Sequence, residues 1–320
     1  MTIWVCGEVL VDRIGESNIL GGGPANTARA VARLGQEVEF VGGISRDEFG
    51  ERACKEFSDD KVGLHHVHRS EKPTAIAAVS LDANGVAKYE FTTSETATFD
   101  FSPDWLPDPS RFKPSLLHIG SLATVIEPGA ASLFEWAVKV SEFAPIIFDP
   151  NVRTGALDDH AQYLEIFERW ASISTVVKAS DEDIDWLYPD QAESAITSRL
   201  LDSGLQLLLI TRGSGGISGS TRDERVEVEG VVTEVVDTVG AGDTVGAVVA
   251  DALVRRGILN LHGDVLRETL NCAVYAAAIT CSRAGAEPPT RSEIDAALLL
   301  AASGTSGTLG TLGRGTDAIH

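Results

Sequence analysis

The sequence is poor in positive charge and in cysteine, and it lacks long hydrophobic runs. Its 26 Lys and Arg residues face 47 Asp and Glu residues, which gives a formal net charge of −21. Nucleic acids and anionic membrane surfaces attract a basic face, so we expect neither as a partner. No segment approaches the roughly 20 apolar residues of a transmembrane helix, and the first residues do not resemble a signal peptide. These absences predict a cytoplasmic protein.

The spacing of the cysteines and the absence of common catalytic motifs argue against further classes of protein. Cys6, Cys54, Cys272 and Cys281 lie far apart without a CxxC pair, which favours reduced, buried thiols over a disulfide framework or a zinc site. There is no GxxxxGK[ST], HExxH or GxSxG, and no GxGxxG follows a predicted strand. The P-loop, metalloprotease, hydrolase and dinucleotide-binding classes therefore lose their main support.

The sequence does contain an alternation of short apolar runs with helical patterns. The apolar runs predict a strand that opens within residues 2–12 and further strands over residues 38–42, 115–121, 144–150, 174–180 and 205–213. Helical spacing occurs over residues 24–35, 130–143, 160–172 and 267–285. This alternation is typical of βαβ units around a mostly parallel sheet, and 320 residues suffice for one large domain.

Two regions depart from the alternation. Residues 72–101 contain two β-type runs joined by DANG, whose Asn84-Gly85 pair is a strong hairpin signal. We expect a small antiparallel flap there, attached to the main sheet. The chain end over 301–320 is rich in Gly, Thr and Ser without periodicity, which predicts a disordered tail.

The segment 235–257, VVDTVGAGDTVGAVVADALVRRG, combines a helix pattern with an open start. Apolar residues recur at helical spacing from Val245, and Gly257 stands where a glycine ends many helices, so a helix is expected over about 242–256. Residues 240–242 would present N–H groups at the positive end of the helix dipole, with little side chain to block an anion. A Gly-rich turn capped by Asp243 explains the same letters, and local physics does not separate the two interpretations.

A second glycine-rich stretch precedes another predicted helix. GGGPANTARAVARLG, at 21–35, places three glycines before Pro24 at the first helical position. Asn26 in the first turn would direct an amide toward whatever fills the glycine gap. A flexible turn before an ordinary helix remains the alternative. Asp12, after the first strand, is either a turn residue or part of the same site.

Polar residues also follow the carboxyl ends of four predicted strands. They are Asp149 and Asn151, Lys178 and Ser180, Thr211 and Gly213, and Asp237. Ligands of open α/β sheets bind at this edge, so the coincidence favours a binding site there. Ser180 and Asp183 also fit a capping box, which alone would account for both.

These motifs resemble those of the ribokinase-like, or pfkB-type, carbohydrate kinases over about residues 3–300. GGGPANTA resembles the first signature of that family and DTVGAGD the second, and DEFG, KASDED, TRGSGG and CSRAGAEPP also match. HIGSLATV, FDPNVR and VVKASDEDIDWLYP are most similar to bacterial fructokinases. The resemblance implies a three-layer αβα, Rossmann-like fold with a mostly parallel sheet. It implies one kinase domain over 1–300, with a small β lid from about 9–20 and 72–101.

The resemblance also implies roles for individual residues. Asp243 would be the general base, and the backbone of Gly240, Ala241 and Gly242 would form the anion hole. The residues expected to hold the sugar are Asp12, Gly22, Gly23, Asn26 and Arg153. Those expected on the side of the nucleotide and its Mg²⁺ are Lys178, Ser180, Asp183, Thr211, Gly213 and Gly216. A candidate K⁺ site is expected at the main-chain carbonyls of Asp237, Val239, Thr280, Arg283 and Gly285.

The implied reaction is transfer of the γ-phosphoryl group of ATP to a sugar hydroxyl, with fructose as the expected acceptor. Alternative acceptors are 2-keto-3-deoxygluconate, another sugar or a nucleoside. A non-catalytic sugar-binding regulator is a different class, which the presence of Asp243 and the glycines disfavours. The usual Asn-x-x-Glu of the family is replaced by Ser180 and Asp183, so the ion would be held through water. The lid would exclude water from the sugar, and it is also a candidate contact for a homodimer.

Overall fold

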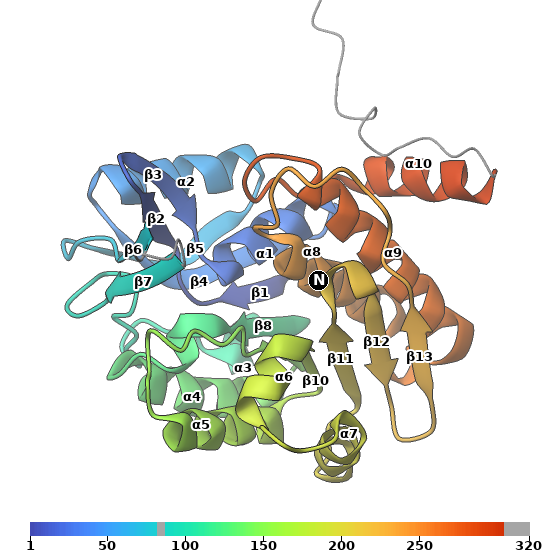
Figure 1. The fold of residues 1–320 in the computed structure, drawn as a ribbon. Helices are drawn as coiled ribbons and strands as arrows, with labels where there is room; N and C mark the ends of the chain where they lie inside the picture. The colour runs from blue at the N-terminus through green and yellow to red at the C-terminus, as the bar shows by residue number, and fades with distance from the viewer. Residues whose placement is uncertain (82–86, 304–320) are drawn as a thin grey trace, which may run out of the picture.

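A nine-stranded sheet forms the centre of the molecule, for which the computed structural model describes residues 1–81 and 87–303 (Figure 1). Its strands, in spatial order, are β13 (Arg225–Val228), β12 (Ile217–Ser220), β11 (Leu207–Thr211), β10 (Val176–Ser180), β9 (Ile146–Asp149), β8 (Leu116–Gly120), β1 (Ile3–Cys6), β4 (Val38–Ser45) and β5 (Gly63–Ser70). The strands from β11 to β5 pair in parallel, and the hairpin β12–β13 adds an antiparallel edge. The predicted, mostly parallel sheet is confirmed.

Helices cover both faces of this sheet and create two hydrophobic cores. One face carries α1 (Gly23–Arg33), α2 (Glu48–Asp59), α8 (Ala241–Arg256), α9 (Gly263–Cys281) and α10 (Arg291–Ala302). The other face carries α4 (Gly129–Ser141), α5 (His160–Ile173), α6 (Asp181–Leu187) and α7 (Glu193–Asp202), and a short helix, α3 (Pro109–Phe112), precedes β8. The central strands are buried on both faces, as expected of a parallel sheet between helices. The three-layer αβα prediction is confirmed.

A second sheet of four strands lies beside the main one (Figure 1, upper left). Its order is β3 (Ser17–Gly21), β2 (Leu10–Ile14), β6 (Ile76–Leu81) and β7 (Ala87–Thr92). β6 and β7 are antiparallel, as the DANG signal predicts, whereas β2 pairs with β6 in parallel. The DANG turn lies outside the described residues.

The N-terminal segment 2–12, expected to open as a strand, contributes to both sheets. β1 belongs to the large sheet and β2 to the small one, because the chain bends between them at Gly7, where φ is 149°. A Cβ atom at Gly7 would lie 2.3 Å from Cγ of Pro24, so only glycine fits this bend. The bend brings the small sheet over the first turn of α1.

The predicted helix boundaries hold to within a few residues. α8 begins one residue before the expected start and ends at Arg256, with Gly257 at φ 76° directly after it. α10 extends to Ala302, and residues 304–320, most of the expected tail, lie outside the described part of the chain. The short 3₁₀ turns are η1 (Ser121–Thr124), η2 (Gly213–Gly215) and η3 (Ile258–Asn260). Among the helices described here, none is long and apolar enough to cross a membrane.

Candidate active site

The N-terminus of α8 opens at the edge of the large sheet where the parallel strands end. Gly240 precedes the helix in the left-handed conformation, with φ 81° and ψ −3°. A Cβ atom there would lie 2.7 Å from Cβ of Ala286, so a side chain is excluded by contact as well as by conformation. The first i→i−4 bond of the helix runs from the N–H of Thr244 to the carbonyl of Gly240, at 2.9 Å. The N–H of Ala241 donates weakly to the Thr238 carbonyl at 3.3 Å, and the next N–H groups point out of the helix end.

The two glycine-rich segments meet at Asp243. Nδ2 of Asn26, in the first turn of α1, donates to Oδ2 of Asp243 at 2.8 Å across 217 residues of sequence. A Cβ atom at Gly23 would lie 3.1 Å from Oδ1 of Asp243 and 3.1 Å from Nδ2 of Asn151. The absence of a side chain at Gly23 therefore lets the two helix N-termini approach each other.

The surroundings of Asp243 favour its neutral form. Burial raises the pKa of Asp243 to about 6, and the nearby carboxylate of Asp149 acts in the same direction. The hydrogen bond from Asn26 and the charges of Lys178 and Arg153 oppose this shift. A carboxyl group with a pKa just below neutral is ionised at pH 7 yet basic enough to accept a proton, which is what general-base catalysis needs.

β9 and β10 end in a buried ion pair close to Asp243. Nζ of Lys178 lies 2.6 Å from Oδ2 of Asp149, with the two side chains 6% and 5% exposed. Burial lowers the pKa of Lys178, but the nearby carboxylates of Asp149, Asp243 and Asp183 together outweigh burial, so the net shift is upward and the ammonium stays charged. Nζ lies 3.5 Å from the position that a Cβ atom of Gly242 would occupy. The ammonium therefore lies beside the first turn of α8.

The residues expected around a sugar lie on the other side of Asp243. The carboxylate of Asp12, on β2, faces the glycine segment. Its Oδ2 lies 2.3 Å from the position that a Cβ atom of Gly21 would occupy. Gly22, the N-cap of α1, has φ 112°, and a Cβ atom there would lie 2.6 Å from the carbonyl oxygen of Glu8. Burial raises the pKa of Asp12, and the charge of Arg153 opposes this shift. Arg153 itself is exposed, and its charge also lowers the pKa of Asp243.

Glu8 is a buried carboxyl group that the sequence analysis did not single out. It is 1% exposed, and its Oε2 accepts a hydrogen bond from the N–H of Ala123 at 3.2 Å. Burial raises the pKa of Glu8 to about 7, against the hydrogen bond from Ser121. No local pattern of the sequence marks Glu8, because its burial depends on the contact with the distant η1 turn.

A mainly apolar cavity of about 590 Å³ adjoins the N-terminus of α8. This volume suits a small-molecule ligand. Three of the six residues expected near a nucleotide line it, together with Gly242 of the helix start; they are Thr211, Gly213 and Gly216. The cavity wall also includes Val231, Val235, Val274, Ala278 and Cys281, among others.

The other three residues expected near the nucleotide lie outside this cavity wall. Lys178 forms the ion pair described above, and Ser180 and Asp183 form a complete capping box at the start of α6. Oδ2 of Asp183 accepts from the N–H of Ser180 at 2.9 Å, and its Oδ1 accepts from the N–H of Val152 at 2.8 Å. Ser180 and Asp183 thus tie the end of β10 to the segment after β9.

The residues of the candidate K⁺ site lie at 237–239, at the end of α9 and on the loop after it, and Asp237 joins these segments. The prediction that Asp237 follows a strand is wrong: the segment before it is irregular, because its backbone bonds to the end of α9, with the N–H of Val236 donating to the carbonyl of Cys281 at 2.8 Å. Its Oδ1 accepts from the N–H of Val239 at 3.0 Å, and its Oδ2 accepts from the N–H of Gly285 at 2.9 Å. The carbonyl of Thr280, at the end of α9, accepts from the N–H of Arg283 at 3.0 Å. Within the described ranges, no group of three or more His, Cys, Asp or Glu side chains could hold a metal ion.

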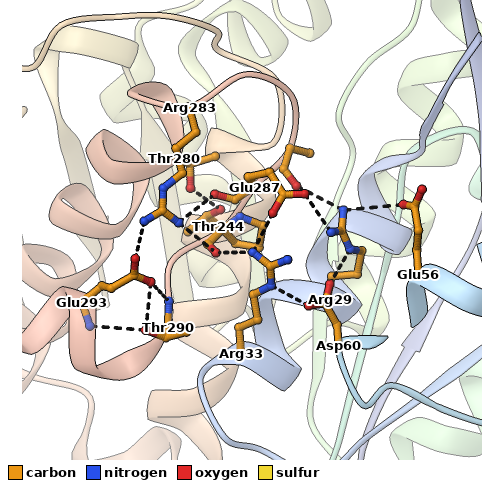
Figure 2. Close-up of polar contacts among 12 residues, drawn as sticks. Arg29, Arg33, Glu56, Asp60, Thr244, Thr280, Arg283, Glu287, Thr290 and Glu293 are labelled. Carbon is orange, nitrogen blue, oxygen red and sulfur yellow. Dashed lines mark hydrogen bonds and ion pairs between the residues drawn. The ribbon is translucent and has the colours of Figure 1, made fainter. Parts of the chain in front are cut away.

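An ion-pair network holds the loop 283–290 against α1 (Figure 2). Nε of Arg29 lies 2.6 Å from Oδ2 of Asp60, and its Nη2 lies 3.0 Å from Oε1 of Glu287. Arg33 repeats this arrangement, with Nε 2.7 Å from Oδ1 of Asp60 and Nη1 2.8 Å from Oε2 of Glu287. The network fixes the loop whose Ala286 contacts Gly240 at the start of α8.

Comparison with known proteins identifies the family. The pfkB family carbohydrate kinase domain matches residues 9–293. The chain is 32% identical over 280 residues to a fructokinase from Rhizobium leguminosarum bv. trifolii. The aligned region covers 83% of this chain and 85% of that protein.

Two solved structures share the fold over nearly the whole chain. A fructokinase from Xylella fastidiosa with bound ATP has a TM-score of 0.86 at 27% identity, covering 95% of this chain and 99% of that one. A fructokinase from Vibrio cholerae O395, in a form with fructose, ADP and calcium, has a TM-score of 0.80 at 25% identity, covering 92% and 98%. The chain therefore belongs to the pfkB family of carbohydrate kinases.

Proposed function

We propose that this protein is an ATP-dependent fructokinase, which transfers the γ-phosphoryl group of ATP to a hydroxyl group of fructose. The observation that carries the proposal is the position of the buried Asp243. It lies in the first turn of α8, where backbone N–H groups are open, it is bonded to Asn26 of α1, and it lies beside the cavity. The fructokinases to which the chain is similar support the acceptor. The bound ATP of the Xylella fastidiosa protein supports the donor.

Phosphoryl transfer depends on alignment and charge stabilisation more than on covalent chemistry. Asp243 takes the proton of the attacking sugar hydroxyl, a role that its pKa of about 6 supports. The backbone of Gly240, Ala241 and Gly242 receives the charge of the transferring group, because the dipole of α8 is positive there. The ammonium of Lys178, beside Gly242, adds a fixed positive charge on the same side.

The two substrates approach Asp243 from opposite sides. Asp12, Gly22, Gly23, Asn26 and Arg153 bind the sugar. The place of Asp12 on the small sheet and of the other three beside or in the first turn of α1 supports the first four, and the charge of Arg153 near Asp12 and Asp243 supports the fifth. Thr211, Gly213 and Gly216 bind the nucleotide, which their place in the wall of the cavity supports. Such an arrangement would bring the hydroxyl and the γ-phosphorus together at the end of α8.

Mg²⁺ is the divalent ion that we propose accompanies the nucleotide. Oδ1 of Asp149 is buried without a hydrogen-bond partner in the described structure, and a carboxylate oxygen is a ligand that Mg²⁺ accepts. Lys178, Ser180 and Asp183 already hold protein partners, so Ser180 and Asp183 would reach the ion only through water. The bound ion would neutralise phosphate charge. K⁺ is proposed at the carbonyls of the loops that Asp237 joins.

The small sheet is proposed to act as a lid within a single kinase domain. It carries Asp12 on β2, so its movement would carry a sugar-binding group. Ile14 and Ile19, 52% and 45% exposed on the same sheet, support a contact between two copies as a homodimer. A cytoplasmic location is proposed for this ATP-dependent activity.

Release of ADP with a panel of sugars tests the proposal. We expect turnover with fructose in the presence of ATP and Mg²⁺, and much slower turnover with ribose and nucleosides. Turnover of 2-keto-3-deoxygluconate without turnover of fructose would overturn the acceptor. Binding of sugars with no ADP release from any of them would instead favour a non-catalytic regulator.

A further inference from the structure

His118 on β8 is buried and has no hydrogen-bond partner for either ring nitrogen. It is 2% exposed, and both Nδ1 and Nε2 are unpaired within the part of the chain that the structure describes. Burial, together with the charge of Lys178, lowers the pKa of His118 to about 3. The ring is therefore neutral at pH 7, with one nitrogen able to donate and the other able to accept. Buried polar atoms without partners are rare and call for a specific cause.

Strand register places His118 on the same face of the sheet as the Asp149–Lys178 pair. In the pairing of β8 with β9, His118 lies opposite Ile147 and Gly120 lies opposite Asp149. Alternate residues of a strand share a face, so His118 and Asp149 point the same way. Lys178 joins them there, since its Nζ reaches Oδ2 of Asp149 at 2.6 Å.

α8 covers this face with glycine above each of the two basic groups. A Cβ atom at Gly246 would lie 2.9 Å from Nε2 of His118, and one at Gly242 would lie 3.5 Å from Nζ of Lys178. Gly242 and Gly246 are one helical turn apart. The imidazole and the ammonium therefore lie under consecutive turns of the helix whose first turn contains the proposed general base.

The polar capacity of this cluster exceeds what the described protein atoms satisfy. The ammonium of Lys178 has three N–H donors, and its one described hydrogen bond goes to Asp149. Oδ1 of Asp149 and both nitrogens of His118 have no partner among the described residues. A buried water molecule with two to four polar partners is the usual way in which such a cluster is satisfied.

We propose that a buried water molecule joins His118 to the Asp149–Lys178 pair, and that His118 is thereby a positioning residue for the Lys178 ammonium. The water accepts from Lys178, donates to one lone pair of Oδ1 of Asp149, which leaves the second lone pair for the proposed ion, and bonds to one nitrogen of the neutral ring. These contacts hold the ammonium against the first turn of α8. The role in phosphoryl transfer rests on the proposed function, whereas the water site does not.

Substitution of His118 tests the positioning role. We expect His118→Leu, which is apolar, to lower kcat for fructose phosphorylation roughly 10- to 100-fold, the scale of a small misplacement of a catalytic group, with KM values little changed. His118→Gln, whose amide can donate and accept, should recover most of that loss. Leu116→Val is the matched control, because Leu116 is an apolar residue on the same face of β8. It should keep the wild-type kcat.

Two outcomes would overturn the positioning role. One is a wild-type kcat in His118→Leu, and the other is an equal loss of kcat in His118→Leu and Leu116→Val, which would indicate general disruption of the core. Failure of His118→Leu to fold leaves His118→Gln as the deciding variant. In that case a His118→Gln protein as inactive as Lys178→Met would count against the proposal.

Nitrogen NMR of the histidine-labelled wild-type protein tests the water site without any substrate. We expect the His118 ring to remain a single neutral tautomer down to about pH 5, with its N–H in contact with a slowly exchanging water. A ring that titrates near pH 6.5, or one without a water contact, would overturn the water site. This readout separates the inference from the proposed function, because it does not depend on turnover of fructose by the wild-type protein.

Discussion

At the scale of single residues, the surroundings of Asp243 determine its protonation. Its pKa is raised to about 6 by burial and by Asp149, and the proposed role as a general base needs its ionised form. We therefore expect kcat to be constant at neutral pH and to fall tenfold per pH unit below about 6. The pH profile of kcat at saturating fructose and ATP measures this. A profile that is flat down to pH 4.5 would exclude Asp243 as the base.

Replacement of Asp243 by Asn separates chemistry from structure. We expect kcat to fall roughly 10²- to 10⁴-fold, the usual effect of losing a general base, with nucleotide affinity retained. A raised folded-state pKa means that Asp243 stabilises the fold below the unfolded pKa near 4, and that this contribution is lost as pH rises through about 6. The Asn variant should therefore be at least as stable as wild type at pH 8, as thermal unfolding would measure. Near-normal kcat in the folded variant would assign Asp243 a purely structural role.

Sequence reasoning could identify Asp243 and Asn26 but not Glu8 or His118, and the reason is physical. The first two stand at helix N-termini that glycine and proline mark in the sequence, so local rules locate them, and the family resemblance supplies their expected roles. His118 becomes notable only through strand register and a glycine 128 positions away on α8, and Glu8 only through its bond to the η1 turn. Local patterns carry no information on such contacts.

At the scale of elements, periodicity predicted the central strands and the helices α1, α4, α5, α8 and α9, but not α2, α7, α10, β5 or the hairpin β12–β13. The apolar residues of α8 recur at helical spacing because they form the stripe that packs on the sheet, and this spacing made the helix predictable. The division of the N-terminal segment into β1 and β2 depends on contact of Gly7 with Pro24, which no periodicity encodes. The ion-pair clamp on loop 283–290, which consists of Arg29, Arg33, Asp60 and Glu287, joins Arg29 to partners 31 and 258 residues away.

That clamp provides a prediction about the element it holds. Asp60 binds Arg29 and Arg33 together and is 12% exposed, so Asp60→Ala leaves two guanidinium groups less compensated. We expect a loss of roughly 1–3 kcal/mol in the free energy of unfolding, the usual cost of removing such a partner. The KM for ATP should also rise, because the released loop adjoins the start of α8.

Asp59→Ala is the control for this prediction. Asp59 is 63% exposed and pairs only with Lys55 on the same helix among the described contacts, so its loss should change neither stability nor KM measurably. Denaturant unfolding and steady-state kinetics on the two variants test the comparison. Equal stability of the two variants would show that the clamp contributes little.

At the scale of the whole molecule, the two sheets supply different parts of the candidate site. The large sheet supplies a fixed edge, where α8, β9 and β10 hold Asp243, Asp149 and Lys178. The small sheet is connected to β1 through the bend at Gly7 and carries Asp12 on β2, beside α1. A binding site assembled from two sheets can close on its ligand by movement of the smaller one, which would exclude water as a competing acceptor.

Asp12→Ala tests this division of roles. Loss of the carboxylate proposed to bind sugar hydroxyl groups should raise the KM for fructose roughly 10- to 100-fold, the range for hydrogen bonds to a charged group, and leave the KM for ATP unchanged. Arg13→Ala is the control, because Arg13 is its exposed neighbour on β2 and its side chain bonds only to Asn18 among the described residues. Hydrogen exchange should show β2 and β6 protected by fructose in wild type and in Arg13→Ala, but not in Asp12→Ala. Protection that fructose does not change in the wild-type protein would mean that the small sheet is a fixed wall of the site, and Asp12 would then bind the sugar without closing over it.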